Sequence, residues 1–328
     1  MATVEAPFSL TQDANPGGVD CQSASTLSFE TMHGHGVAPT SFLRTAAFSS
    51  VQAGRLLFPV LGLPNVWVER GESPLTDTHL AVLLYLASQV RVYDQALGAN
   101  VRFNPRDAIC ALGWSNTNSS MVRLIAAIEA LATTTLRICH GDGFDSQEAA
   151  PLIGRRIANL SVAEHRQRRV WEVQMLSPIL NALESHRTYV SLRTFAALPN
   201  GVTKRLFLFV RSERRKVSEW DFNELSSVVG LSSGNTAHRK RKFEDAFGTL
   251  SAGTAEKVAR GVVVSSGRKG RIESFAADGK AVKRSTSIRQ VEFRPVVESW
   301  QFVRSRRGTE RVQIVKAGAI SEEPRALD

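Results

Sequence analysis

The sequence lacks long apolar runs and has few cysteines. No stretch approaches the ~18 apolar residues of a membrane-spanning helix, and the N-terminus lacks the basic and then apolar order of a secretory signal peptide. Cys21, Cys110 and Cys139 form no CxxC pair and are odd in number. We therefore interpret them as reduced thiols, with Cys110 packed in a helix. We expect a cytoplasmic protein without a membrane partner.

The motifs of common enzyme classes are also absent. The chain has no HExxH and no phosphate-binding Gly-rich loop with its lysine, and we identify no nucleophile elbow. We interpret His33 and His35, in a Gly-rich segment, as solvent-exposed coil rather than metal ligands. Asp142 and Asp145 belong to a Gly-Asp-Gly turn rather than to a two-metal nuclease site. We expect no enzymatic activity, no cofactor and no bound metal.

Lysine is missing from residues 1–200, and the surplus of positive charge is confined to the rest of the chain. The whole chain carries +10, with a pI near 10.0. Residues 1–200 hold 15 arginines and 16 acidic residues, a net charge of −1, whereas residues 201–328 hold 26 basic and 15 acidic residues, a net charge of +11. Such a surface favours a DNA partner, because binding releases counterions condensed on the phosphates. A merely solvated surface is the alternative.

Residues 234–250 predict a helix with an apolar and a basic face, entered through a tight turn at residues 229–232. With about 100° per residue, Ala246, Phe247 and Leu250 fall within about 60° of Phe243. A helix of this kind after a turn is typical of a DNA-reading helix, although an isolated helix of this pattern is more often simply solvated on its charged side. The opposite face holds His238, Arg241, Lys242 and Asp245.

The same pattern occurs about 117 residues earlier in the chain. There a turn at residues 112–115 leads into a predicted helix over residues 118–131, whose apolar residues share one stripe. We interpret the two copies as an internal repeat of one module. The exposed face of the earlier helix offers one cation and several small residues, so we expect it to anchor phosphates or to contact protein. This face holds Ser119, Arg123, Ala126 and Ala130.

Two further helices are predicted before each turn. They span residues 75–90 and 104–112 in the first copy, and 202–211 and 218–229 in the second. Pro105 suits the first position of its helix, and Ser218 with Asp221 is a near-match to a capping box. Strand-forming segments follow each copy, at residues 135–139 and 170–175 and at residues 258–264 and 271–275. The second pair flanks a basic turn, and residues 280–297 favour one further strand.

Helix, helix, turn, helix and hairpin is the order of a winged helix. We therefore predict an α+β fold with two tandem winged-helix domains, a flexible N-terminal arm and a basic C-terminal extension. The predicted boundaries are 1–42 for the arm, 43–195 for the first domain, 196–300 for the second domain as the main DNA-reading module, and 301–328 for a C-terminal tail without regular structure.

The second module is expected to carry most of the sequence specificity. Arg241 or Lys242 would pair with guanine O6 and N7, while Asp245 would brace Arg241 or accept from cytosine. The predicted DNA-binding residues are Asn235, Thr236, His238, Arg239, Lys240, Arg241, Lys242 and Asp245 on the second helix, Arg268, Lys269 and Arg271 on the wing, and Asn116, Asn118, Ser119 and Arg123 in the first module.

The segment from Arg44 to Phe48, the turn at 112–115, and residues 198–209 and 220–250 resemble, in this order and spacing, the TrfA-type plasmid replication initiators. The resemblance covers about residues 43–250. It implies a bacterial protein with two winged-helix domains that binds direct repeats, called iterons, at a plasmid origin. It also implies origin opening with host DnaA, recruitment of the DnaB helicase, and an equilibrium between monomer and dimer.

Members of that family can carry a sliding-clamp-binding peptide of the Gln-Leu-Ser-Leu-Phe kind ahead of the first domain. The nearest match here, residues 26–29, lacks the glutamine and the final Leu-Phe pair. We therefore favour an uninvolved arm over clamp contact through Leu27 and Phe29.

Two other functions compete with an initiator. A winged-helix transcription regulator would bind an inverted repeat as a dimer, whereas two different modules in one chain favour direct repeats. A DNA-nicking enzyme would need a suitable tyrosine or a carboxylate cluster. Tyr85 and Tyr93 lie in or beside a predicted apolar helix, and Tyr189 has no nearby histidine pair.

Overall fold

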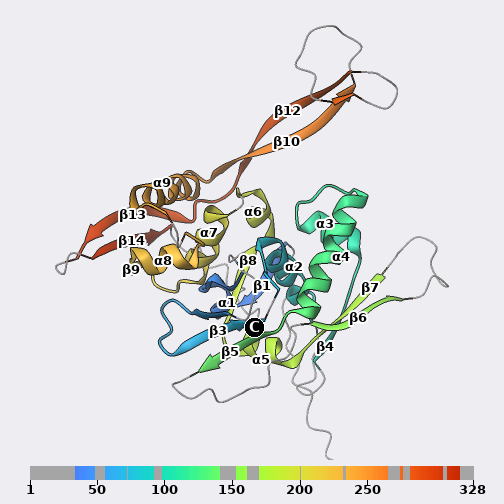
Figure 1. Ribbon diagram of the computed structural model, residues 1–328, viewed down its shortest axis with the longest axis horizontal. Coiled ribbons are helices and arrows are strands. Elements are labelled where there is room, and N and C mark those ends of the chain that lie inside the picture. The colour runs from blue at the N-terminus through green and yellow to red at the C-terminus, as the bar shows by residue number, and fades with distance from the viewer. Residues whose placement is uncertain are drawn as a thin grey trace, which may run out of the picture.

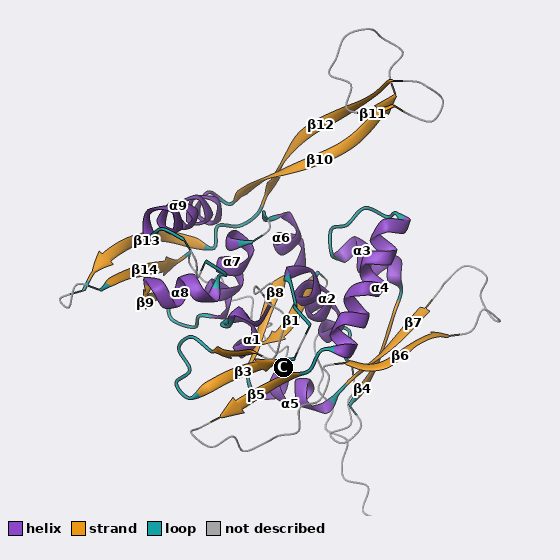
Figure 2. Cartoon of the chain, viewed as in Figure 1, coloured by secondary structure: helices purple, strands orange, loops and turns teal. Residues whose placement is uncertain are grey.

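Two winged-helix units make up most of the described chain, and the fold is of the α+β class as predicted (Figures 1 and 2). The structure is a computed structural model. It describes residues 34–48, 56–71, 73–91, 98–140, 153–160, 170–199, 201–231, 234–264, 274–275, 281–305 and 309–317.

The first winged-helix unit has three helices and a three-stranded antiparallel sheet. The helices are α2 (Asp77–Ser88), α3 (Pro105–Ala111) and α4 (Asn118–Thr133). The strands, in the order β4-β7-β6, are β4 (Ala99–Phe103), β7 (Val170–Met175) and β6 (Ile153–Leu160). Local signals start these helices: Asn104 accepts a hydrogen bond from the Arg106 N–H at 2.9 Å, and Pro105 opens α3 as predicted.

The second unit repeats this arrangement. Its helices are α7 (Val202–Ser212), α8 (Phe222–Val228) and α9 (Thr236–Ala252). Its strands, in the order β9-β14-β13, are β9 (Val217–Asp221), β14 (Glu310–Lys316) and β13 (Val297–Arg304). In both units the strand between the first and second helices pairs with the last strand of the sheet. The predicted internal repeat therefore extends to the strand order.

The turn between the second and third helices is the same in both units. Gly113 and Gly230 adopt φ angles of 67° and 81°, which favour glycine. The Trp114 N–H donates to the Ile109 carbonyl at 3.0 Å, and the Leu231 N–H donates to the Ser226 carbonyl at 2.7 Å. Each bond spans five residues and closes the Schellman motif at a helix C-terminus.

The start of α8 differs from the prediction. Asp221 caps the helix, because its carboxylate accepts from the N–H groups of Asn223 and Glu224 at 2.8 and 3.1 Å. Ser218 lies instead in β9, opposite Ile314 of β14. The predicted helix over 218–229 was therefore wrong for its first residues, since a strand partner about 90 residues further along the chain determines their conformation.

Both predicted hairpins were also wrong in their pairing. β5 (Leu136–His140) pairs with β3 (Val66–Arg70), which pairs with β2 (Leu56–Pro59), and β7 pairs with β4 and β6. After α9, β10 (Thr254–Val264) pairs with β12 (Ala281–Glu292), and β11 (Ser274–Phe275) also pairs with β12. The further strand expected in residues 280–297 is β12. Figure 1 shows β10 and β12 as a long ribbon extending from the body beside α9.

The expected flexible ends contain regular structure. β14, which lies after Arg304, is the middle strand of the second sheet, so residues 310–316 are not the predicted tail. β1 (His35–Pro39) pairs with β8 (Arg187–Ser191), so the predicted arm is ordered from residue 35. His35 lies in β1, and His33 lies outside the described residues. The remaining elements are α1 (Thr40–Leu43), a short 3-10 helix (Ala46–Phe48), α5 (Ser177–Ser185) and α6 (Leu192–Ala197).

The segment 44–48 joins the two units through buried arginines. Arg44 donates to the side chain and carbonyl of Ser212, at 3.1 and 2.8 Å. Arg205 of α7 donates to the Phe48 carbonyl and forms an ion pair with Asp77 at the start of α2. Both arginines are less than a tenth exposed. The first helices of the two units are thus tied to each other and to this segment.

The sequence analysis also made predictions about membrane-spanning helices and about the environment of the cysteines. No helix in the described ranges is both long and apolar enough to cross a bilayer. Cys110 is exposed on α3, so the prediction that it is packed was wrong, whereas Cys139 is buried. Cys21 lies outside the described residues.

Candidate nucleic-acid interface

Helix α9 is held by its apolar face, as its sequence pattern predicts. Asn235 caps it by accepting from the Ala237 N–H at 2.9 Å. Phe243 lies 5.4 Å from the Phe222 ring of α8, and Phe247 stacks on Trp300 of β13 at 5.0 Å. Phe243, Ala246, Phe247 and Leu250 are all buried. The opposite face of α9 therefore lies toward solvent.

Two cations and a histidine occupy that outer face. His238, Arg241 and Lys242 are exposed, and they make no hydrogen bond or ion pair within the described part of the chain. Asp245 is exposed as well, and no ion pair joins it to Arg241 in the described ranges. The helix thus presents charged groups that have no partner in the described part of the protein.

The other two basic residues of α9, which the sequence analysis predicts to bind DNA, contact the protein. Arg239 donates to Asn223 of α8 at 3.1 Å, and its guanidinium lies 5.3 Å from the Phe222 ring centroid. Lys240 forms an ion pair with Glu310 of β14 at 2.6 Å. These contacts fix α9 on α8 and on the sheet. Sequence reasoning missed Asn223 and Glu310, for which no local signal exists.

The wing of the second unit is the β13–β14 hairpin. The Ser305 N–H donates to the Thr309 carbonyl at 2.8 Å near its tip, and Arg304 is exposed there. The predicted wing residues Arg268, Lys269 and Arg271 lie outside the described residues. Apolar residues at alternate positions on both sides of a basic, Gly-containing turn were the available signal for this hairpin.

The first module presents a less basic helix start. Thr117 caps α4 by accepting from the Ser120 N–H at 3.3 Å. Asn116, Asn118 and Ser119 are exposed around this N-terminus, where N–H groups and the helix dipole favour a phosphate. The predicted apolar stripe packs inward, with Leu124, Ile128 and Leu131 buried and Met121 and Ile125 half-buried.

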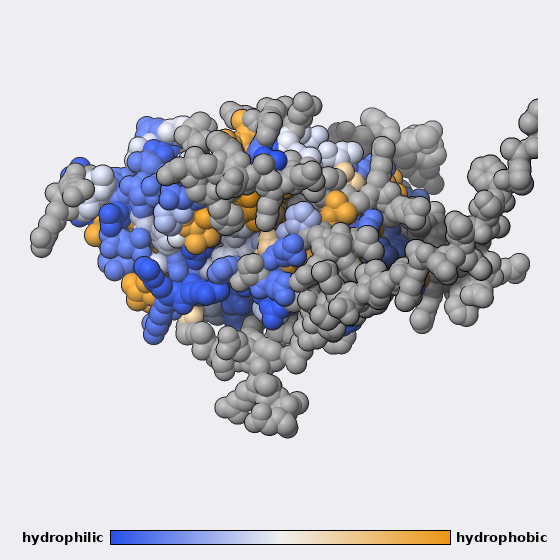
Figure 3. All heavy atoms as spheres, turned by 90° about the horizontal axis from the view of Figure 1, so that it is seen from below, coloured by the Kyte–Doolittle hydropathy of each residue, from blue (hydrophilic) through white to orange (hydrophobic). Residues whose placement is uncertain are grey.

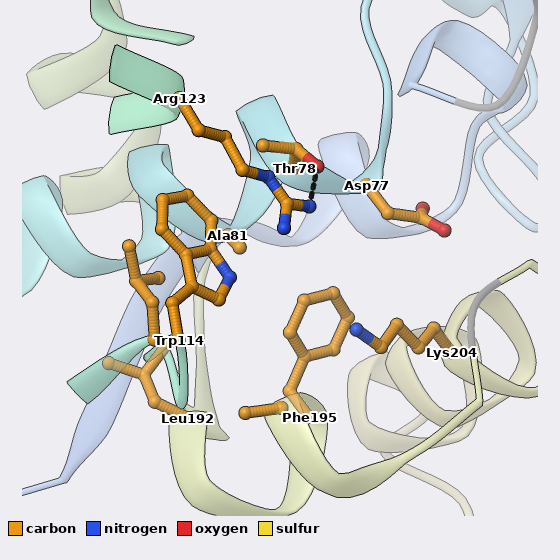
Figure 4. A pocket seen from close by; sticks show the side chains of 10 residues that line it. Asp77, Thr78, Ala81, Trp114, Arg123, Leu192, Phe195 and Lys204 are labelled. Atoms are coloured by element: carbon orange, nitrogen blue, oxygen red, sulfur yellow. Dashed lines mark hydrogen bonds between the residues drawn. The ribbon is translucent and has the colours of Figure 1, made fainter. Parts of the chain in front are cut away.

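Arg123 of α4 is held against the protein, although its residue is exposed overall. Its guanidinium donates to the Thr78 hydroxyl at 2.6 Å and lies 4.4 Å from the Trp114 ring centroid. Figure 4 shows it beside Thr78 among the residues that line a pocket, which also include Trp114, Phe195 and Lys204. Burial lowers the pKa of Arg123. These contacts join α4 to α2, which leaves Arg123 less available to phosphates than predicted.

The sequence analysis considered several tyrosines and acidic residues for catalysis and two residues of the N-terminal arm for clamp contact. Tyr85 is buried edge-on to Phe103 at 5.9 Å, and burial raises the pKa of its hydroxyl to about 12. Tyr189 is half-buried beside Arg187. Among the described residues, no group of three or more His, Cys, Asp and Glu side chains is arranged to hold a metal. Four further candidates lie outside the described residues: Leu27, Phe29, Tyr93, and the Asp142 and Asp145 turn.

Exposed apolar side chains are scattered over the described surface. Val122 on α4 is 65% exposed, and Leu57 and Trp67 on β2 and β3 are 47% and 42% exposed. The view from below in Figure 3 shows hydrophobic patches within a mostly hydrophilic surface. Scattered exposure of this kind is ordinary for a globular protein, so the basic face of α9 remains the clearest candidate interface.

Comparisons with known proteins found one family model that matches part of the chain and solved structures that are similar to it. No curated protein matches the chain. Among solved structures, the chain is similar to domains 2 and 3 of RctB: one structure has 11% identity and a TM-score of 0.46, covering 86% of this chain and 99% of that chain. A second RctB structure of domains 2-3 has 12% identity and a TM-score of 0.42, with 81% and 92% coverage. Residues 68–211, from β3 to α7, match the family model Rep3_N, described as Initiator Replication protein, WH1.

Proposed function

We propose that this protein is a replication initiator that binds double-stranded DNA at an origin. The observation that carries the proposal is the match of residues 68–211 to the WH1 domain of initiator replication proteins. A winged helix alone does not define a function. The second unit adds support, because it repeats the same order of helices and strands and bears an outward basic helix.

Helix α9 is the proposed reading element in the major groove. Arg241 or Lys242 would bind guanine O6 and N7, and Asp245 would accept from a cytosine amino group. His238 and Thr236 lie nearer the helix start, the part that usually contacts base edges in this motif. The support is the exposure of these residues and the absence of intramolecular pairing at His238, Arg241 and Lys242 in the described chain.

The first unit would contribute mainly phosphate contacts. Asn116, Asn118 and Ser119 surround the N-terminus of α4, where phosphate contacts set orientation without reading sequence. Arg123 already contacts Thr78 and Trp114. The two units would therefore divide the work unequally, with α9 supplying most of the specificity.

An unequal pair of units in one chain fits an asymmetric DNA site. We propose that such sites occur as direct repeats, the iterons of a bacterial plasmid origin, and that no palindrome is needed. The same proposal includes origin opening with host DnaA, recruitment of the DnaB helicase, an equilibrium between monomer and dimer, and action in the cytoplasm without catalysis by this chain. Clamp contact is not included.

The test is a DNase footprint of the purified chain over the DNA flanking its own gene, at two salt concentrations. We expect several protected repeats in one orientation, each spanning about two helical turns, with protection weakening as salt rises. One protected palindrome over a promoter would indicate a transcription regulator instead. No protection at either salt concentration would contradict the DNA-binding proposal.

Substitution of Arg241 tests which residue reads bases. Arg241→Ala should reduce the discrimination between the protected repeat and a scrambled duplex by about 1–3 kcal/mol, the value of a bidentate contact to guanine. Arg193→Ala is a matched control, because Arg193 is also an exposed helical arginine but lies on α6. Equal discrimination by wild type and Arg241→Ala would show that Arg241 does not read a base.

A further inference from the structure

The ribbon of β10 and β12 leaves the body at a fixed point beside the proposed reading helix. Gly253, directly after α9, has φ 66°, and its carbonyl accepts from the Phe293 N–H at 2.7 Å. A Cβ at this position would lie 2.5 Å from the Phe293 carbonyl oxygen. The Val296 N–H also donates to the Leu250 carbonyl at 3.0 Å. Both strands are therefore tied to the C-terminal end of α9.

The length of the ribbon matches a helical turn of DNA. β10 and β12 are paired over 11 positions, from Thr254 opposite Glu292 to Val264 opposite Val282. At about 3.3 Å per residue, they extend over about 35 Å, and one turn of B-DNA is about 34–36 Å. Figure 1 shows the ribbon rising from the α9 side of the body, away from β3 and β5.

Positive charge is concentrated in the segment of the chain that contains the ribbon. Residues 254–292 contain nine basic and four acidic residues, a net charge of +5, which is half the surplus of the whole chain. The two acidic residues of the strands, Glu256 and Glu292, stand at the end nearest α9. Beyond them the two strands contain only cations among their charged residues. These are Lys257, Arg260, Lys283, Arg284 and Arg289.

Register divides these positions between two faces. Lys257 stands opposite Arg289, and Lys283 stands opposite Val263, so these positions belong to one face by strand alternation. We call this set of positions the basic face. Between its cations the same face holds only small residues, Ala259 opposite Ser287 and Gly261 opposite Ser285, and no acidic residue.

Two properties of the basic face favour a polyanion. The register places Lys257 opposite Arg289, and like charges at opposite positions destabilise a strand pair, a penalty that a bound polyanion would offset. Small residues leave room for a close approach of another backbone. A two-stranded ribbon also has little stability of its own, so a binding partner along its length would stabilise it.

We propose that the basic face of the ribbon binds the phosphate backbone of duplex DNA next to the site read by α9. This inference rests on the proposed function, since it assumes that α9 binds DNA. Phosphate contacts along one turn would lengthen the protected site and add salt-dependent affinity without adding base specificity.

Two duplexes and two variants of the full chain test this contact. One duplex contains only the protected repeat, and the other extends it by one helical turn on each side. Lys257→Gln with Arg289→Gln removes two charges from the basic face, whereas Arg260→Gln with Arg284→Gln removes two from the opposite face. Affinity is measured from 50 to 200 mM salt. Circular dichroism and thermal unfolding check that each variant is folded.

The expected result is specific to one variant and one duplex. On the extended duplex, Lys257→Gln with Arg289→Gln should make the negative slope of log affinity against log salt shallower by about 2, one for each lost phosphate contact. On the short duplex, both variants should show the salt slope of wild type. On the extended duplex, the control variant should also show the salt slope of wild type. Equal slopes for all proteins on the extended duplex, or equal losses in both variants, would overturn the inference. Failure of wild type to bind either duplex would overturn the proposed function with it.

Discussion

Replacement of Arg205 by alanine tests whether the buried arginines join the two winged-helix units energetically. Arg205 is 3% exposed, pairs with Asp77 at 2.5 Å and donates to the Phe48 carbonyl. Removing one member of a buried ion pair costs about 3–5 kcal/mol. The Asp77 side chain keeps 20% exposure, so water can reach its carboxylate, and we expect the lower end, about 3 kcal/mol.

The measurement is urea unfolding followed by circular dichroism and tryptophan fluorescence. Trp171 lies in β7 of the first unit and Trp220 in β9 of the second, so the fluorescence signal samples both. A cycle with Asp77→Asn and the double variant should give a coupling energy of about 1–3 kcal/mol. Arg214→Ala is the control, because Arg214 is exposed and such substitutions usually change stability by less than about 0.5 kcal/mol.

The result that would refute this reasoning is specific. If Arg205→Ala loses less than about 1 kcal/mol of unfolding free energy, the desolvated pair contributes no more than an exposed one. Zero coupling between Arg205 and Asp77 in the cycle would lead to the same conclusion. In either case the Arg205–Asp77 pair would not contribute to joining the two units.

Two further predictions concern helix ends. Burial and the charge of Arg123 lower the pKa of His79, whose Nδ1 accepts from the Thr76 N–H at 2.8 Å. The stabilising contribution of neutral His79 should therefore be complete above the unfolded pKa of about 6.5 and decline as pH falls through it. His79→Gln keeps an acceptor and should show a smaller loss of stability between pH 7.5 and 5.5 in urea titrations; an unchanged loss would contradict this. Gly253→Ala should destabilise the chain by about 1–3 kcal/mol, because of its positive φ and the close Phe293 carbonyl. Gly248→Ala, with nothing within 4 Å of the added Cβ, should be neutral or stabilising by up to about 1 kcal/mol, and equal thermal shifts for the two variants would refute the argument.

Local signals explain what could be predicted from the sequence. The Asn104 and Pro105 helix start, the turns at Gly113 and Gly230, and the apolar face of α9 each depend on a few neighbouring residues. Periodicity and capping preferences operate over this range. For this reason the helices of both units, and the repeat that relates them, were predicted close to their observed positions.

The features that could not be predicted from the sequence depend on pairing between residues far apart in the chain. Ser218 resembles a helix cap until β14 is available to pair with β9, and β10 pairs with β12 rather than with β11. In the same way, Lys240 looks like a phosphate ligand until Glu310 is placed beside it. A single sequence does not encode these partners locally, so the basic residues of α9 that contact protein could not be separated from those without a partner in the described part of the chain.

Under the proposed function, the position of the ribbon separates the reading of DNA sequence by α9 from the length of DNA that the protein contacts. The connection from the third helix to the next strand of the sheet takes 19 residues in the first unit, from α4 to β6, and 44 in the second, from α9 to β13. A little more than one doubling of loop length costs only about 0.7 kcal/mol of closure entropy. Closure entropy therefore adds only a small penalty for the longer connection, while α9 packs on Phe222 and Trp300.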